Sequence, residues 1–414
     1  MTAPASFPAS TSYGRLEAGT PGFKKATLAL FLGGFSTFAM LYGTQPILPL
    51  FVELFTISPT QASLSVSAGT AGLAIMLIPA SILSDRYGRG RVMKISLTLA
   101  AIIAFTCTLA ADFTQLLILR GLLGAVLAGL PASALAYLGE EIAPNAQGRA
   151  VGLYIAGNAL GGLSGRILAS TVAESGSWRL SLTALAILGC IAAIAFWRNL
   201  PASRHFHIRT VTFRRILDDT RIIYSDTGLR WLFLAGFLLM GAFVGLYNYL
   251  GFHLLAPPFN LSQTGIGAIF FLYLIGTWAS AWAGRLTDRL GRANVLWAMV
   301  SIMFLGLTLA LGKQLWIVIL AVALFTFGFF GAHTTASGWV SHRAGEQRAL
   351  GAALYLCSYY FGGSVLGSIA GMAWDSHGWP SVVGILMLLT LIALAVSLYL
   401  RHRLRISSAA PPRH

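Results

Sequence analysis

The sequence predicts an all-α integral membrane protein with 12 transmembrane helices in two six-helix bundles. Three observations indicate this fold class: an apolar composition, a series of apolar runs long enough to cross a membrane, and an internal repeat. Hydrophobic residues make up 56% of the 414 residues, only 10% are charged, and the mean hydropathy is +0.75. A soluble domain carries about 25% charged residues, so this chain in water would expose large apolar areas. Lipid removes that problem if each span forms its backbone hydrogen bonds as a helix.

A helix that crosses a bilayer needs roughly 20 mostly apolar residues. The runs that meet this requirement lie near 26–51, 60–84, 93–111, 115–138, 149–171, 180–198, 230–252, 264–286, 293–312, 315–339, 349–372 and 380–400. They divide the chain into a disordered tail (1–25), a first bundle (26–199), a linker (200–229), a second bundle (230–400) and a second tail (401–414). Apolar residues from Phe213 to Tyr224 recur at helical spacing. This spacing predicts a short amphipathic helix on the membrane surface, with a disordered linker as the alternative.

Positive charge gathers on one side of the predicted spans. The net charge is +15, and all but four of the 28 Lys and Arg residues fall in tails and loops on the side of the N-terminus. This asymmetry matches the positive-inside rule, and it places both termini in the cytoplasm. The positive-inside asymmetry explains the positive net charge without a nucleic-acid partner. We therefore expect a lipid bilayer as the surroundings and no bound DNA or RNA.

The two predicted bundles resemble each other, as in transporters built from internal repeats. The segment from Ser81 to Arg89 recurs about 200 residues later, from Gly284 to Arg292. Two further matches follow the same order along the chain: Leu41-Tyr42 with Leu246-Tyr247, and Leu153-Tyr154 with Leu354-Tyr355. In the repeated loops, glycine permits a tight reversal between helices, and Asp and Arg four residues apart can pair on one helical turn.

These loops resemble motif A of the major facilitator superfamily, Gly-x-x-x-Asp-Arg-x-Gly-Arg, although Ser81 replaces the leading glycine of the first copy. Arg120, four residues before Gly124, is similar to motif B. Gly152, Gly161 and Gly165 have the spacing of motif C, the antiporter signature, from which the chain departs at Arg166, Ala169 and Ser170. The stretches 42–46, 153–158, 201–206 and 354–360 resemble more narrowly the YnfM-type branch of bacterial inner-membrane transporters.

The resemblance implies a monomeric, multi-pass transporter of the inner membrane, with two bundles that rock about a site at the midplane. Its function would be proton-coupled efflux of small amphipathic molecules, as in drug:proton antiporters. The alternative is export or uptake of a sugar or organic anion without a buried carboxylate. The resemblance also implies a conformational latch formed by Asp85, Gly88, Arg89, Glu140 and Glu141 in the first half, and by Asp288, Gly291, Arg292 and Glu346 in the second.

Polar residues within the spans are candidates for contact with cargo or protons. All 13 Asp and Glu residues fall in loops, tails or span ends, although many proton-coupled carriers use a buried carboxylate. Arg120 and Arg166 lie inside apolar runs. Each could bind an anionic cargo, reach the outer surface, or pair with Glu53, Asp112 or Glu174. The remaining cavity candidates are Tyr42, Gln45, Asn158, Tyr247, Asn248, His333, Tyr355 and Tyr359, and His253 is a second titratable residue; hydrogen bonding between helices is the alternative for each.

Other function classes lack the residues they require. The sequence has no Gly-x4-Gly-Lys-Ser/Thr phosphate-binding loop, and its spans carry no acid–base pair or cluster of metal ligands. We therefore expect no enzymatic activity, no ATP-driven pumping, no metal and no cofactor. A channel usually gains its pore from oligomer symmetry or rings of charge. A duplicated single chain does not need such a pore, so a channel is disfavoured. Cys107, Cys190 and Cys357 lie in separate apolar runs and are expected to be thiols rather than disulfides.

Overall fold

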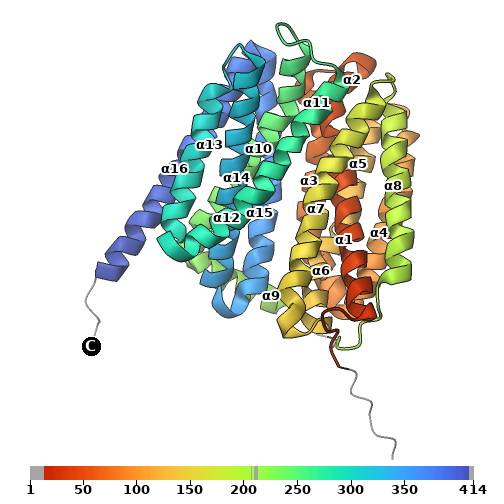
Figure 1. The fold of residues 1–414 in the computed structure, drawn as a ribbon, viewed down its shortest axis with the longest axis vertical. Helices are drawn as coiled ribbons and strands as arrows, with labels where there is room; N and C mark the ends of the chain where they lie inside the picture. The colour runs from red at the N-terminus through yellow and green to blue at the C-terminus, as the bar shows by residue number, and fades with distance from the viewer. Residues whose placement is uncertain (1–13, 207, 209–212, 410–414) are drawn as a thin grey trace, which may run out of the picture.

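The computed structural model describes residues 14–206, 208 and 213–409, and almost all of them are helical (Figure 1). The first half contains α1 (Pro21–Tyr42), the 3₁₀ turn η1 (Gln45–Ile47), α2 (Leu48–Phe55), α3 (Pro59–Tyr87), α4 (Arg89–Thr108), α5 (Phe113–Leu127), α6 (Gly129–Glu141), α7 (Pro144–Ala173) and α8 (Trp178–Asn199). The linker holds α9 (Phe213–Ser225). The second half contains α10 (Thr227–Leu255), α11 (Gln263–Ile269), η2 (Phe270–Leu272), α12 (Tyr273–Leu290), α13 (Arg292–Leu309), α14 (Leu315–Arg343), η3 (Gly345–Gln347), α15 (Arg348–His377) and α16 (Trp379–Ala409).

Eleven of the predicted spans form helices, or consecutive helices, whose length and hydropathy suit a membrane crossing. The remaining span is α7, which is 30 residues long and packs along α1. Its hydropathy is lower because it carries Asn158, Arg166 and several glycines on an otherwise apolar helix. The helices stand side by side in two groups in Figure 1. The predicted fold class, two bundles of membrane-spanning helices, is confirmed.

The helices of each half turn apolar side chains outward as well as inward. Leu109, Ile118, Ile191 and Trp278 are all more than half exposed, and a bilayer would cover such residues. The first helix of each half, α1 and α10, is by contrast the most buried span. Each of these two helices packs among other helices, and polar residues on them are therefore placed between neighbouring helices rather than in lipid.

Glycines allow the central helices to approach closely, in the same way in both halves. A side chain at Gly161 of α7 would collide with the backbone carbonyl of Phe35 on α1. The corresponding Gly362 of α15 meets the backbone carbonyl of Phe237 on α10. Small residues at such crossings are typical of membrane helices, which associate through tight packing. The matching contacts agree with the internal repeat in the sequence.

The structure interrupts three of the predicted spans. Span 1 breaks between α1 and η1, just before Pro46, and span 4 breaks between α5 and α6, just before Pro131. Proline lacks the backbone N–H that would continue a helix and crowds the preceding turn. The third break, at η2 in span 8, contains no proline. It places Phe270 and Tyr273 against the first half.

The two halves are joined by hydrogen bonds between α3 and α15, which we call the joint. Ser67 and Ser368 hydroxyls lie 2.7 Å apart, and Thr60 Oγ1 donates to Asp375 Oδ2 at 2.6 Å. Deeper along the joint, Cys357 Sγ donates to the Ala74 carbonyl at 3.4 Å. Among the described residues, no hydrogen bond or ion pair joins the halves beyond this point, toward the basic ends of α3 and α15. In Figure 1 the halves accordingly meet near α2 and α11 and diverge toward α9.

Candidate functional site

Arg166 of α7 lies at the contact between the two halves, without a carboxylate beside it. Its side chain is 2% exposed. The Nε group donates to Gln45 Oε1 at 2.7 Å, and Nη1 donates to the Gly162 carbonyl at 2.7 Å. Within the described residues, Nη2 has no hydrogen-bond partner. The pairing with Glu174 or another outer acid that the sequence allowed is therefore absent, and the side chain points inward rather than to the surface.

Three aromatic rings surround the Arg166 guanidinium. Tyr42 of α1 lies 4.5 Å from it, and from the second half Tyr273 and Phe270 lie at 4.9 and 5.2 Å. Cations are attracted to the faces of such rings, more strongly when water is excluded. The second half is bound to the same place by Gln45 Nε2, which donates to Asn248 Oδ1 at 2.8 Å. We call Tyr42, Gln45, Arg166, Asn248 and Tyr273 the Arg166 site.

Several polar atoms of the Arg166 site are buried without partners among the described residues. They are the hydroxyls of Tyr42 and Tyr273 and the side-chain nitrogen of Asn248. Buried polar groups in proteins are nearly always hydrogen-bonded. Each of these three atoms can donate a hydrogen bond, as can Arg166 Nη2. The site thus offers a cation and several free donors, a combination suited to an anionic oxygen.

Arg120 of α5 is arranged quite differently. Its Nε donates to the Ser65 carbonyl at 3.1 Å, Nη1 donates to the Met40 carbonyl at 2.7 Å, and Nη2 donates to the Leu41 carbonyl. Because α1 ends at Tyr42, the carbonyls of its last turn lack N–H partners in the helix. Arg120 supplies those partners from another helix, and its charge also suits a helix C-terminus. All three of its nitrogens are occupied, so it holds α1, α3 and α5 together.

The other predicted cavity residues fall into three places. His333, Tyr355 and Tyr359 meet in the second half, where His333 Nδ1 lies 3.0 Å from Tyr355 Oη and the His333 ring lies 4.4 Å from that of Tyr359. Tyr247 bonds Thr326 at 2.7 Å and lies beside Tyr273. Asn158 is separate, packed against Gly34 of α1.

A continuous row of aromatic rings connects the His333 cluster to the Arg166 site. The Phe329 ring stacks on Phe243 at 3.8 Å, Phe243 lies 4.9 Å from Tyr247, and Tyr247 lies 5.0 Å from Tyr273. The sequence analysis missed Phe243, Phe270, Tyr273 and Phe329. The aromatic run at 270–273 in the sequence is the signal that could have indicated two of them. This aromatic row gives the Arg166 site an apolar wall in the second half.

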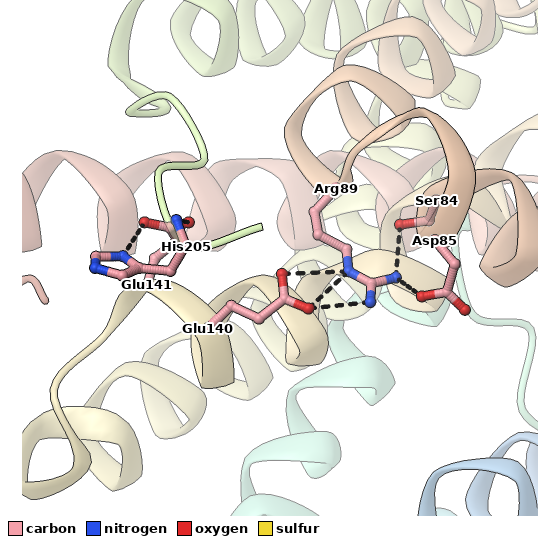
Figure 2. A network of polar contacts seen from close by, with 6 residues as sticks. All are labelled: Ser84, Asp85, Arg89, Glu140, Glu141 and His205. Carbon is pink, nitrogen blue, oxygen red and sulfur yellow. Dashed lines mark hydrogen bonds and ion pairs between the residues drawn. The ribbon is translucent and has the colours of Figure 1, made fainter. Parts of the chain in front are cut away.

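The predicted latch of the first half forms a connected polar network on the basic side (Figure 2). Arg89 Nη1 lies 2.5 Å from Asp85 Oδ1 and 3.3 Å from Ser84 Oγ, while Nη2 lies 3.0 Å from Glu140 Oε1. Gly88, with φ of +101°, makes the reversal from α3 to α4 in a conformation that favours glycine. The Arg89 guanidinium thus lies between two acids from different helices, α3 and α6.

Glu141 joins the linker to the same face of the first half. Its Oε1 accepts a hydrogen bond from the His205 backbone N–H at 2.8 Å, and Oε2 lies 3.1 Å from His205 Nδ1, as Figure 2 shows. The ring of the next residue, Phe206, lies 5.7 Å from the Arg89 guanidinium. The linker segment before residue 207 is therefore packed against the latch network.

The second half does not repeat the network of the first. Gly291 makes the same kind of reversal, with φ of +80°, but no ion pair or hydrogen bond between described residues connects Asp288, Arg292 and Glu346. At the basic end of the second half, Arg343 at the end of α14 instead forms an ion pair with Asp226, and Arg343 Nε lies 2.7 Å from Asp226 Oδ1. Partial burial raises the pKa of Asp226, but hydrogen bonds from Arg343 and Leu229 outweigh it and hold that pKa below its usual value. No group of three His, Cys, Asp or Glu side chains in the described part of the chain could hold a metal ion.

Comparison with known sequences identifies the family. The family model described as the Major Facilitator Superfamily matches residues 30–256 and again residues 232–413. The chain belongs to the major facilitator superfamily. It is therefore a membrane transporter, and the two matches of the family model overlap at residues 232–256. As a member of this superfamily it is not an enzyme.

Curated relatives of this superfamily member are similar along nearly their whole length. The chain is 40% identical to the "Inner membrane transport protein YnfM" of Escherichia coli (strain K12), over 94% of this chain and 93% of the relative. It is also 40% identical to the "Uncharacterized MFS-type transporter YybF" of Bacillus subtilis (strain 168), over 93% and 95%. The resemblance to the YnfM-type branch is thus confirmed.

Solved structures show the same fold at low sequence identity. A bacterial homologue of the human lysosomal transporter Spinster, in an inward-facing and occupied conformation, aligns with a TM-score of 0.76 and 16% identity, over 93% of this chain and 98% of the other. The nucleoside transporter NupG (D323A mutant) aligns with a TM-score of 0.69 and 16% identity, over 90% and 97%. At this identity the likeness concerns the major facilitator fold alone.

Replacing Asp85 with asparagine is expected to reduce transport by about tenfold or more, the scale of a conformational coupling, while the protein stays folded. Asparagine keeps the size of the side chain but removes the charge that faces Arg89, which retains Glu140 and Ser84. Flux in vesicles and thermal unfolding of the purified protein measure the two effects. Asp218→Asn, which removes an exposed acid 3.6 Å from Arg221 in α9, is the matched control. Unchanged flux in Asp85→Asn would contradict the latch role.

Proposed function

We propose that this transporter moves amphipathic molecules that carry an anionic group, and that Arg166 binds that group. The observation that carries the proposal is a fully buried guanidinium between the halves with no acid beside it. A buried charge without a partner is strongly unfavourable. An anionic cargo would neutralise it and would also accept hydrogen bonds from the free donors of Tyr42, Tyr273 and Asn248. This choice corresponds to the organic-anion alternative of the sequence analysis.

The aromatic row supports an amphipathic cargo rather than a small inorganic anion. Binding sites for small molecules combine mostly apolar walls with a few polar groups that fix orientation. Here the polar groups gather around Arg166, and the rings of Tyr247, Phe243 and Phe329 lead away from them. The anionic end of a cargo would meet Arg166, and its apolar body would lie along these rings.

Alternating access is the proposed mechanism, because the hydrogen bonds between the halves in the described part of the chain are confined to one side. The Arg166 site lies at these contacts, so separation of the halves would expose it toward that side. In the described structure this side is closed and Arg166 is 2% exposed, so access from the basic side requires the helices and rings around the site to move as well. We propose that the protein works in this way as a monomer in the inner membrane, with both termini in the cytoplasm.

A cysteine pair across the joint is expected to stop this cycle. Because the Ser67 and Ser368 hydroxyls are 2.7 Å apart, Ser67→Cys with Ser368→Cys places two thiols within reach of a disulfide. In a background with Cys107, Cys190 and Cys357 replaced by serine, oxidation should reduce flux to the level of empty vesicles and reduction should restore it. The single variants should not respond to oxidant. Full flux with the disulfide formed would rule out separation at the joint.

Proton-coupled efflux is the second candidate, favoured by the position of His333. Histidine changes charge near neutral pH, and His333 faces Tyr355 and Tyr359 in the aromatic row. His333→Ala is expected to abolish proton movement driven by cargo while cargo-for-cargo exchange continues. Measuring both in the same vesicle preparation separates a coupling residue from a binding residue, because loss of binding would remove exchange as well.

The cargo class can be tested in everted vesicles energised to an acid interior and monitored with a pH-sensitive dye. Organic acids, lipophilic cations and sugars would be added in turn, with empty-vector vesicles as the control. Labelled organic acids would be followed in parallel, so that flux without proton movement is also detected. Saturable flux of organic acids that depends on Arg166 supports the proposal. Flux of lipophilic cations or sugars, with none of organic acids, would overturn it.

A further inference from the structure

A groove on the outer face of the first half lies between α4 and α8, away from the joint. It has a volume of about 420 Å³, and its wall is almost wholly apolar, formed by residues such as Ala101 and Ile102 of α4 and Ala193 and Ile194 of α8. Ile102 and Ile194 are each more than half exposed. The groove therefore opens toward the surrounding lipid rather than toward the Arg166 site.

Two positive charges, those of Lys94 and Arg198, lie at one end of the groove. Trp197 of α8 donates from Nε1 to Thr98 Oγ1 at 2.9 Å, and Thr98 donates to the Lys94 carbonyl at 2.9 Å. The Lys94 ammonium lies 5.0 Å from the centre of the Trp197 ring. Arg198, next to Trp197, also lines the groove. The hydrogen bonds orient the Trp197 ring, and the ring places the Lys94 ammonium beside this end of the groove.

The polarity of this face changes along its length. On α4, Arg91, Lys94, Thr98 and Ile102 lie on one helical face by their spacing, and they run from basic through polar to apolar. No Asp or Glu occurs on α4 or α8. The acids at the nearby end of α6 are engaged elsewhere, Glu140 with Arg89 and Glu141 with His205. The groove thus has no acid of its own to neutralise Lys94 and Arg198.

Trp197 indicates where this face lies in the bilayer. Tryptophan gathers at the level of the lipid headgroups, and Trp197 lies two residues before the end of α8 at Asn199. From Trp197 to Cys190, deeper in the groove, the helix rises roughly 10 Å at 1.5 Å per residue. The groove therefore runs from the headgroup level into the acyl region, with its charges at the headgroup level.

We propose that this groove binds an anionic phospholipid of the surrounding leaflet. The phosphate contacts Lys94 and Arg198, and one acyl chain lies along Ala101, Ile102 and Ile194. Basic pockets between membrane helices are known to bind anionic headgroups. Here the basic end leads directly into the apolar groove, as the headgroup of a phospholipid leads into its acyl chains. A free phosphate would satisfy the basic end only, so the apolar groove commits the site to a lipid.

The test compares phosphatidylglycerol with phosphatidylcholine of the same acyl chains, added to the purified full chain in detergent. Affinity is measured by native mass spectrometry. Each basic residue near an anionic surface strengthens binding by about fivefold, so Lys94→Gln with Arg198→Gln should weaken phosphatidylglycerol binding on the order of tenfold or more and leave phosphatidylcholine unchanged. Arg285→Gln with Arg289→Gln removes the same charge from α12 and is the matched control. Equal losses in both double variants would show diffuse attraction and overturn the proposal.

Cys190 gives an independent readout, because it lines the groove. In a Cys107→Ser, Cys357→Ser background, phosphatidylglycerol should slow the reaction of Cys190 with a maleimide by several fold, and inorganic phosphate at the same concentration should not. The protection should disappear in the Lys94→Gln, Arg198→Gln variant. Protection that persists in this variant, or that inorganic phosphate reproduces, would contradict a lipid held by these two residues.

Discussion

Replacing Arg166 with glutamine is expected to reduce flux of an anionic cargo by about 100-fold. The guanidinium is the only charge that the Arg166 site presents among the described residues, and a hydrogen bond to a charged group contributes about 1.5–3 kcal/mol. Glutamine can still bond Gln45, so the contact between α7 and η1 is retained. Arg166→Lys should recover only part of the flux, because an ammonium cannot reproduce the planar, ring-stacked geometry of the guanidinium.

Flux of labelled organic acid in vesicles measures this effect, and thermal unfolding shows whether the variant is folded. Lys313→Gln is the matched control, since Lys313 is an exposed cation on the same side as Arg166 and lies outside the site. A loss of flux in Lys313→Gln equal to that in Arg166→Gln would point to a general surface-charge effect. Wild-type flux of organic acids in Arg166→Gln would exclude Arg166 as the binding group.

Replacing Arg120 with methionine is expected to destabilise the protein by roughly 3 kcal/mol or more. The change leaves the last-turn carbonyls of Met40 and Leu41 buried without the donors that Arg120 provides, whereas the Ser65 carbonyl lies inside α3 and keeps its partner within that helix. Each unsatisfied buried acceptor costs about 1–3 kcal/mol, and removal of a buried, unpaired charge offsets part of the sum. Because α1 would lose the partners at its last turn, the break that presents Gln45 to Arg166 should also loosen.

Unfolding temperature and expression level in the membrane measure the Arg120 effect. Arg120→Lys is the informative comparison, because it keeps the charge but cannot reach three carbonyls at once; we expect it to remain clearly less stable than the wild type. The conservative change Ser65→Ala removes a side chain but leaves the carbonyl that Arg120 binds, so it should be nearly neutral. Wild-type stability in Arg120→Met would contradict the structural role.

The sequence could predict the helices and the pairing of the halves because both depend on patterns along the chain. Apolar runs set the spans, and the repeated loops around Asp85 and Asp288 indicated the duplication. It could also propose Tyr42, Gln45, Arg166 and Asn248 as candidates, and the structure brings these four together. Each is a polar residue within an apolar run, and that property can be read from hydropathy alone.

The distinction between the two buried arginines could not be predicted in this way. Both occur in apolar runs, and what separates them is which acceptors lie within reach. The acceptors of Arg120 are backbone carbonyls, exposed because α1 stops at Tyr42, and backbone groups carry no sequence signal. The rotation of each helix is also needed to know that Tyr273 faces Arg166. For the same reason the sequence could not indicate that the second half lacks the ion pairs seen around Arg89.

The chemistry of the joint between α3 and α15 affects how readily the halves can part. Ser67, Ser364, Ser368 and Cys357 hold it through hydroxyl and thiol groups, and each such bond is worth only about 0.5–1.5 kcal/mol net because water can replace it. A joint of leucines would add about 1.5–3 kcal/mol for every side chain exposed on opening. The free energy needed to separate these side chains is therefore smaller than for a joint of leucines, and the short side chains can meet again in the same register. Such a joint favours reversible opening over tight closure.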